Sequence, residues 1–123
     1  MNYIVYVMFV HFLGDFVFQS REMATNKSSS LFWLTAHVMM YGCILLVGLT
    51  FIGLIPGQFP VSQIDLMTYV FANMGLHFMI DFVTSKLSSK FWKNGQTHKF
   101  FMVIGFDQFL HFTSLYLTLK IFF

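Results

Sequence analysis

Charge is scarce in this chain: only 10% of its 123 residues are Asp, Glu, Lys or Arg. A soluble domain carries charge at about a quarter of its positions. So few charged groups cannot solvate a globular surface, and 57% of the residues are hydrophobic. The composition therefore excludes an ordinary soluble domain. It predicts an integral membrane protein with room for one small domain, residues 1–123.

Cysteine is scarce as well, and the N-terminal residues do not have the pattern of a cleavable leader. Cys43 is the only cysteine, which excludes an intrachain disulfide, and we expect it to be a buried apolar side chain. Residues 1–16 lack the basic segment and small-residue cleavage site of a secretory signal, so we interpret them as part of a retained first span. The formal charge of +2 is too small to indicate a nucleic-acid partner.

Long apolar runs are what the chain does have. A bilayer span needs roughly 17 to 25 predominantly apolar residues. Lipid offers no partners to backbone N–H and C=O groups, so such runs should be helices. The predicted fold class is all-α, an integral membrane four-helix bundle. Its approximate spans are 2–19, 31–55, 65–87 and 99–123.

The segments between these runs carry turn and capping signals. Asn and Ser residues before Leu31 are typical of a helix N-terminus. The stretch "PGQFPVSQ" contains both prolines and predicts a turn. A "KNG" turn follows Trp92, which we expect to anchor the chain at the membrane interface.

Basic residues predict the orientation in the membrane. They concentrate in the first and third connections, and the second connection has no Lys or Arg. The positive-inside rule then places these two connections in the cytoplasm and both termini outside, against which only Lys120 argues. We expect a multi-pass protein of the bacterial inner (cytoplasmic) membrane. The cations concerned are Arg21, Lys27, Lys86, Lys90, Lys93 and Lys99.

Histidine and aspartate recur inside the apolar runs. The stretches "HFLGDF" and "HFMIDF" repeat one His-x-x-x-Asp-Phe pattern, and "DQFLH" reverses it. Residues four apart share one helix face, so each pattern presents an imidazole beside a carboxylate. At 1.5 Å per residue, all of these side chains fall about 6 to 18 Å from one membrane face, which predicts one site opening toward the cytoplasm. The set is His11, Asp15, His37, His77, Asp81, Asp107 and His111.

These residue types suit a divalent transition metal such as zinc, manganese or iron. The set offers more ligands than one zinc takes, so we expect one or two ions; alternatively, some Asp residues orient the histidines. Two further roles stay open for the set. The residues can form a proton or ion relay, or hydrogen bonds that hold the helices together. Each ionisable group costs roughly 2.5 to 3.5 kcal/mol to insert, which favours a functional role.

The repetition extends beyond the hexapeptide, as "HFLGDFVFQS" against "HFMIDFVTSK". Each copy begins a hairpin that turns in a basic connection and returns with a further histidine. Two such hairpins in the same orientation would be related by an axis along the membrane normal. We therefore predict two parallel-repeat hairpins.

If the chain is an enzyme, the residues favour a metal-dependent hydrolase that activates water against a phosphoester or acyl substrate from the inner leaflet. Asp15 or Asp81 would be the general base, and Lys86 with Lys27 would meet an anionic group. Gln19 is a supporting polar contact. The alternatives are a metal-ion or proton transporter, which predicts a homo-oligomer, and a non-catalytic membrane partner. Expected partners are membrane lipids and a small anionic or lipid substrate.

The stretches "HFLGDFVFQS", "MATNKS", "HFMIDF" and "FDQFLH" together resemble the small membrane-protein family catalogued as domain of unknown function 3307. The resemblance covers nearly the whole chain. It implies a four-helix bacterial or phage membrane protein but brings no activity. A looser likeness to bacterial inner-membrane proteins labelled metal-dependent hydrolases is analogy only. The family-type positions it implies are His11, Asp15, Gln19, Lys27, His37, His77, Asp81, Asp107, Gln108 and His111.

Overall fold

The computed structural model describes residues 3–55 and 62–123, which contain helices and no strand. This confirms the all-α class. The elements are α1 (Tyr3–Phe12), a π-helical turn η1 (Leu13–Val17), α2 (Arg21–Asn26), α3 (Leu31–Gly53), α4 (Gln63–Lys93) and α5 (Thr97–Phe122).

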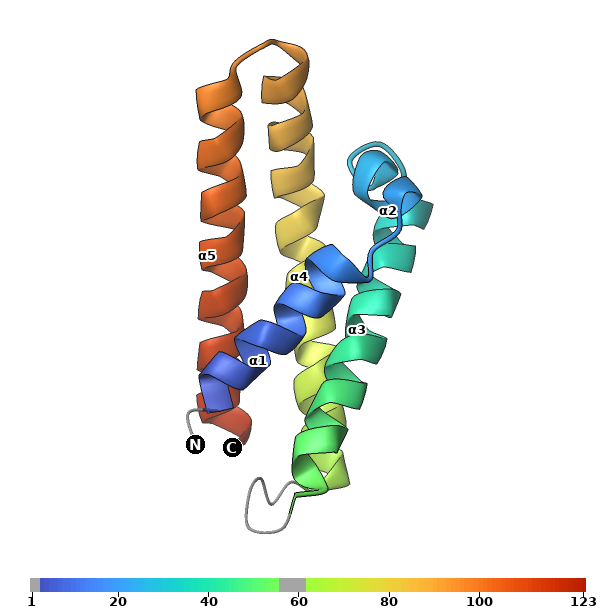
Figure 1. Cartoon of the computed structure of the whole chain (residues 1–123), viewed down its shortest axis with the longest axis vertical. Coiled ribbons are helices and arrows are strands. Elements are labelled where there is room, and N and C mark those ends of the chain that lie inside the picture. The colour runs from blue at the N-terminus through green and yellow to red at the C-terminus, as the bar shows by residue number, and fades with distance from the viewer. Residues whose placement is uncertain (1–2, 56–61) are drawn as a thin grey trace.

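Three of these helices, α3, α4 and α5, are long and apolar enough to cross a membrane. The first predicted span is shorter than expected, because helical structure there ends at Val17. Its rise of about 22 Å is less than the hydrocarbon thickness of about 30 Å. In Figure 1, α1 also runs obliquely across the bundle, whereas α3, α4 and α5 follow its long axis.

The connections largely follow their capping and turn signals. Ser30 caps α3 by accepting a hydrogen bond from the backbone N–H of Trp33. The "KNG" turn occurs as predicted, with Gly95 at φ +68°, a conformation that favours glycine. Helix α4 runs on to Lys93, beyond the predicted end at residue 87. The predicted "PGQFPVSQ" turn lies mostly outside the described residues.

The two ends of the molecule differ in polarity. The start of α1, the end of α5 and the facing ends of α3 and α4 lie at one end, while α2 and the α4–α5 turn lie toward the other (Figure 1). The apolar core occupies the first end, since its members precede the histidines in α1 and α4 and follow them in α3 and α5. Its members are Val7, Val10, Tyr41, Leu45, Leu49, Tyr69, Val70 and Leu115.

Two glycines let α1 and η1 lie close against α3. A Cβ atom on Gly48 would lie 2.7 Å from Val10 Cγ1, and one on Gly14 would lie 3.1 Å from Tyr41 Cδ2. The Gly14 contact brings η1, and with it Asp15, toward the first half of α3. Cys43 is exposed rather than buried, contrary to expectation, because it lies on the α3 face away from the core.

Candidate metal centre

The seven His and Asp residues predicted from the sequence are all buried, and they come together between the helices. Asp15 lies in η1, the π-helical turn that follows α1. There the Phe18 N–H donates to the Leu13 carbonyl at 2.8 Å. Such π-helical turns are rare and frequent at functional sites. In α4 the equivalent pair, His77 and Asp81, lies on regular α-helix. The prediction that separate helices bring these residues to one place is confirmed.

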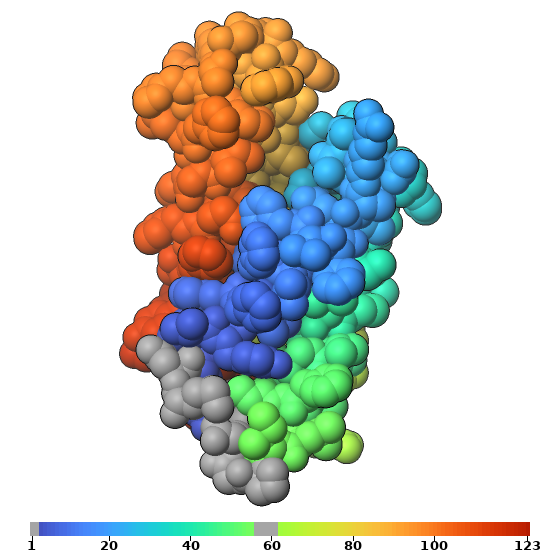
Figure 2. Space-filling model, viewed as in Figure 1, coloured from blue at the N-terminus to red at the C-terminus, as the bar shows by residue number. Residues whose placement is uncertain are grey.

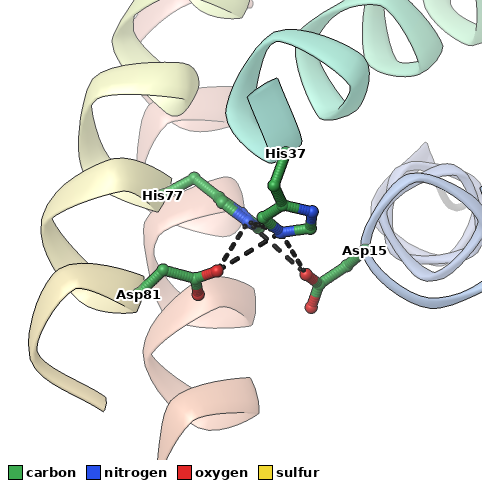
Figure 3. A group of neighbouring side chains, drawn as sticks. All are labelled: Asp15, His37, His77 and Asp81. Atoms are coloured by element: carbon green, nitrogen blue, oxygen red, sulfur yellow. Dashed lines mark hydrogen bonds and ion pairs between the residues drawn. The ribbon is translucent and has the colours of Figure 1, made fainter. Parts of the chain in front are cut away.

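Four donor atoms from η1, α3 and α4 converge at the centre of this cluster (Figure 3). His37 Nε2 lies 3.0 Å from His77 Nε2, 3.1 Å from Asp15 Oδ1 and 3.2 Å from Asp81 Oδ2. His77 Nε2 lies 3.4 Å from the same Asp15 oxygen and 3.6 Å from the same Asp81 oxygen. All four atoms lie within 4.8 Å of one another. We call these four residues the four-donor group.

Five of the six separations among these four atoms match a tetrahedral metal site, and the sixth is below 4.8 Å. At a metal–ligand distance of about 2.0 to 2.1 Å, tetrahedral ligands lie about 3.3 to 3.4 Å apart. The five measured separations, from 3.0 to 3.6 Å, bracket that value. Two imidazole nitrogens at 3.0 Å also cannot both carry protons toward each other. The four-donor group can therefore hold a metal ion.

A second group lies beside the first and shares one of its carboxylates. Asp15, Asp107 and His111 also offer ligand atoms within 4.8 Å of one another. The two Asp15 oxygens face different ways, Oδ1 toward His37 and Oδ2 toward the Gln108 amide, which donates to it at 3.0 Å. The two Asp81 oxygens also have different neighbours: Oδ2 belongs to the four-donor group, and Oδ1 lies 3.1 Å from His111 Nε2. Asp15 can thus offer one oxygen to each of two adjacent groups.

Lys27 contributes an ammonium group to the cluster from the end of α2. Its Nζ lies 2.7 Å from Asp81 Oδ2, 3.4 Å from His37 Nε2 and 4.0 Å from Asp15 Oδ1. Burial alone would lower the pKa of Lys27, but the charges of Asp81 and Asp15 outweigh burial and raise that pKa. The ammonium therefore stays charged at neutral pH.

Charge in the cluster does not balance without further cations. Three carboxylates face one ammonium, which leaves two negative charges in a buried, low-dielectric place. Uncompensated buried charge is costly by several kcal/mol per ion. One divalent cation, or protonation of two of the four histidines, would restore neutrality. The donor chemistry and the charge thus both fit a divalent metal.

The remaining predicted residues divide into two sets. Gln108 joins the cluster through its bond to Asp15, and its Oε1 lies 3.3 Å from His11 Nε2. Lys86 does not join the cluster, because it is exposed and its ammonium lies 3.4 Å from the centre of the Phe82 ring. Gln19 is half-buried near the cluster without contacting the four-donor group. The anion contact predicted for Lys86 at the mouth of the site is thus not supported by its position.

Hydrogen bonding around the histidines is incomplete in one respect. Metal-bound histidines usually donate their second ring N–H to a carboxylate or carbonyl. In the described part of the chain, the Nδ1 atoms of His11, His37 and His77 have no such partner. Tyr41 instead stacks on the His77 ring, with centroids 4.1 Å apart. Hydrogen bonds thus hold these rings on the Nε2 side only, and packing holds the Nδ1 side.

Sequence reasoning missed Thr84 as a member of the cluster. Its hydroxyl group lies within hydrogen-bond distance of both an Asp107 carboxylate oxygen and the Ile80 carbonyl, and donates its one proton to either. A lone threonine gives little signal, since threonines in helices commonly bond back to the preceding turn. Its position three residues after Asp81 was the available clue. Ser85 and Ser88 continue the same buried face of α4.

Helical content, three possible spans and a buried His/Asp cluster define this chain as a membrane protein with a potential metal site. It belongs to the family described as Protein of unknown function (DUF3307), whose model matches residues 3–123. This confirms the resemblance drawn from the motifs. Comparison with curated proteins and with solved structures gives no match.

Proposed function

We propose that this protein is a metal-dependent hydrolase of the bacterial inner membrane, acting on a phosphoester. The observation that carries the proposal is the tetrahedral spacing of the four-donor group. Asp15, His37, His77 and Asp81 would hold the first ion, which is zinc, manganese or iron by the chemistry of the donors. Asp107 and His111, sharing Asp15, would hold a second where two are bound.

The predicted duplication supports this assignment. Within the first hairpin, His37 lies 3.1 Å from Asp15, and within the second, His111 lies 3.1 Å from Asp81. The two i,i+4 pairs match as well, at 3.6 Å for His11–Asp15 and for His77–Asp81. A twofold axis along the membrane normal would relate the hairpins. It would carry the four-donor group onto Asp81, His111, His11 and Asp15, a set that shares Asp15 and His111 with the second group.

A bound divalent metal would lower the pKa of a water molecule and stabilise negative charge on the phosphoryl group. Asp15 and Asp81 supply donor atoms to the first ion. Asp107 lies outside the four-donor group and lines the adjoining pocket, so we assign it the general-base role in the form that holds one ion. Asp107 would accept a proton from water as the water oxygen bonds to phosphorus. The ester P–O bond then breaks, and Asp107 returns the proton to the leaving alkoxide.

The arrangement of the connections supports the predicted orientation. Helix α2, which begins at Arg21, and the α4–α5 turn, which follows Lys90 and Lys93, lie toward the same end of the molecule (Figure 1). The positive-inside rule makes that end cytoplasmic, with both termini outside. The site would then open both to the cytoplasm and to the inner leaflet. A phosphoester substrate would reach it from either side.

A second candidate is proton or ion conduction, favoured by polar groups that continue past the cluster. Asn73 lies one turn before His77 on α4, and its side-chain amide donates to Thr118 Oγ1 on α5 at 3.0 Å. Tyr69 donates to the Leu115 carbonyl at 3.2 Å, further along the same helices. A relay through these groups would need an oligomer or a conformational change, because the apolar core surrounds them.

The first test is metal content by mass spectrometry of the protein purified in detergent. We expect about one or two transition-metal ions per chain, retained in His98→Ala, whose side chain is exposed in the first turn of α5. His37→Ala and His77→Ala should lose metal. Folded protein that stays metal-free on titration would overturn the proposal.

Activity and flux assays then separate the two candidates. Asp107→Asn should abolish phosphoester hydrolysis while leaving metal in the four-donor group. Asn73→Leu should leave hydrolysis unchanged, because Asn73 does not contact the cluster. Proton flux in proteoliposomes that Asn73→Leu abolishes, without any hydrolysis, would favour the relay instead.

A further inference from the structure

A pocket of about 650 Å³ opens beside the cluster, between α2, α4 and α5. Figure 2 shows the surface hollowed between α2 and the outer part of the α4–α5 hairpin. The inner end of the pocket reaches Asp15, Asp81 and Asp107, and its outer end reaches Trp92 and Lys93. Pockets that bind small molecules commonly measure about 300 to 1,000 Å³. This one is therefore large enough for a ligand that reaches the cluster.

Two buried polar atoms next to this pocket have no hydrogen-bond partner in the described part of the chain. They are Ser85 Oγ and Gln19 Oε1, both on residues that line the pocket. The Ser85 side chain is well buried, with 9% of the residue exposed. Leaving a buried polar group unsatisfied costs about 1 to 3 kcal/mol, so such groups usually have partners. A ligand in the pocket would provide one.

Apart from the carboxylates and the acceptor atom Gln19 Oε1, the pocket is lined by polar groups that can donate hydrogen bonds, although the Ser88 hydroxyl already donates to the Ser85 carbonyl. Ser85, Ser88 and Ser89 line the α4 side with hydroxyl groups, and Lys27 and Lys93 add ammonium groups. Donors and positive charges select an anion with several acceptor oxygens, as a phosphate group has. The carboxylates at the inner end would repel that anion unless metal neutralises them, so the inference rests on the proposed function.

The opposite wall of the pocket is apolar. Phe100, Phe101 and Ile104 of α5 line it, and Trp92 lies at its outer end. Trp92 and Phe101 are largely exposed, at 61% and 62%. Tryptophan next to lysines is typical of the membrane–water interface. The pocket thus combines a polar side at the cytoplasmic end of the bundle with a side that suits hydrocarbon.

We propose that this pocket binds a phosphate-bearing amphiphile. Its phosphate group would lie between Ser85 and the metal centre, and its alkyl chain would follow Phe101 and Ile104 toward the bilayer. The volume holds a headgroup and the first part of a chain, so the rest would stay in lipid. The substrate class is therefore a lipid-like phosphoester rather than a soluble one.

The experiment is native mass spectrometry of the protein in dodecyl maltoside, a detergent without phosphate. Dodecyl phosphate is titrated in, with inorganic phosphate and uncharged dodecanol as comparison probes. Each spectrum reports metal and amphiphile on the same molecule, so loss of metal and loss of amphiphile binding are seen separately. The variants are Ser85→Val and Ile104→Ser, and the matched control is Thr68→Val, an exposed threonine at the other end of α4.

We expect dodecyl phosphate to bind the metal-loaded protein and dodecanol to bind far more weakly. Ser85→Val should weaken dodecyl phosphate binding by about tenfold or more, the effect of one hydrogen bond to a charged group. Ile104→Ser should weaken dodecyl phosphate binding but not inorganic phosphate binding. Thr68→Val should change neither.

Two results would overturn the inference. If dodecyl phosphate does not bind the metal-loaded protein, the pocket assignment is wrong, although the metal centre remains supported. If inorganic phosphate and dodecyl phosphate bind equally, the pocket does not bind the alkyl chain. That result would indicate a soluble phosphoester as the substrate. If metal-free protein binds dodecyl phosphate and Ser85→Val weakens that binding, the pocket assignment is supported and the proposed hydrolase function is wrong.

Discussion

The ammonium group of Lys27 lies 2.7 Å from Asp81 Oδ2, the oxygen that Asp81 contributes to the four-donor group. The same ammonium lies 3.4 Å from His37 Nε2, another member of the group. A metal ion coordinated by these atoms would therefore have a positive charge as a close neighbour. Lys27 and a metal ion compete for the same electron pairs, which gives the first prediction.

Lys27→Met should raise metal affinity. Like unit charges about 4 Å apart repel by about 4 kcal/mol at an effective dielectric constant of 20, and a divalent ion is repelled more. Relaxation of the flexible lysine reduces the penalty, so we expect a gain of about tenfold or more in affinity, measured by competition with a chelator. Lys86→Met is the control, because its ammonium lies on the Phe82 ring. A loss of metal in Lys27→Met would contradict competition between the Lys27 ammonium and the metal ion for these donor atoms.

The same substitution should destabilise the metal-free protein. Removing one partner of a buried ion pair leaves the other charge uncompensated, at a cost of about 3 to 5 kcal/mol. With chelator present, we expect Tm of Lys27→Met to fall below that of the unsubstituted protein. Added metal should restore it, because a divalent ion replaces the missing charge beside Asp81. Equal Tm values in chelator would show that Lys27 is not the counter-ion.

The histidines and aspartates of the cluster could be predicted because their spacing is a property of single helices. His77 and Asp81 must share a face of α4 wherever the helix lies. Their common depth then predicted that separate helices would bring them together. The long apolar runs predicted α3, α4 and α5 for the same reason, since length and hydropathy are local properties.

Other features depend on packing between segments and left no local signal. Lys27 lies in a polar connection, where a lysine usually indicates orientation; only the position of α2 against α3 brings its ammonium to Asp81. Lys86 follows Asp81 by five residues, which turns it away from the face that Asp81 shares. The π-helical turn around Asp15 and the short, oblique α1 likewise follow from contacts with α3.

His77→Ala and His11→Ala should differ in metal content. His77 supplies an atom of the four-donor group, whereas His11 Nε2 lies 3.3 Å from Gln108 Oε1 and outside that group. We therefore expect His77→Ala to lose the first ion and His11→Ala to retain it. If unsubstituted protein binds two ions and His11→Ala only one, the second position includes His11, as the twofold relationship between the hairpins requires. Equal loss in both variants would mean a single, larger site.

Gly14→Ala should weaken both the fold and the metal site. A Cβ atom at Gly14 would lie 3.1 Å from Tyr41 Cδ2, so η1 must move away from α3 or Tyr41 must shift from the His77 ring. Overpacking of this kind costs about 1 to 3 kcal/mol, and either shift moves a donor atom of the four-donor group.

Gly75→Ala is the matched control for this change, because a Cβ atom there meets nothing within 4 Å. Replacing glycine by alanine inside a helix favours the helix by about 1 kcal/mol, so Gly75→Ala should leave Tm unchanged or raise it. Thermal unfolding and chelator competition measure the two effects together. A Gly14→Ala protein with full Tm and unchanged metal affinity would show that the close approach of η1 to α3 does not position Asp15.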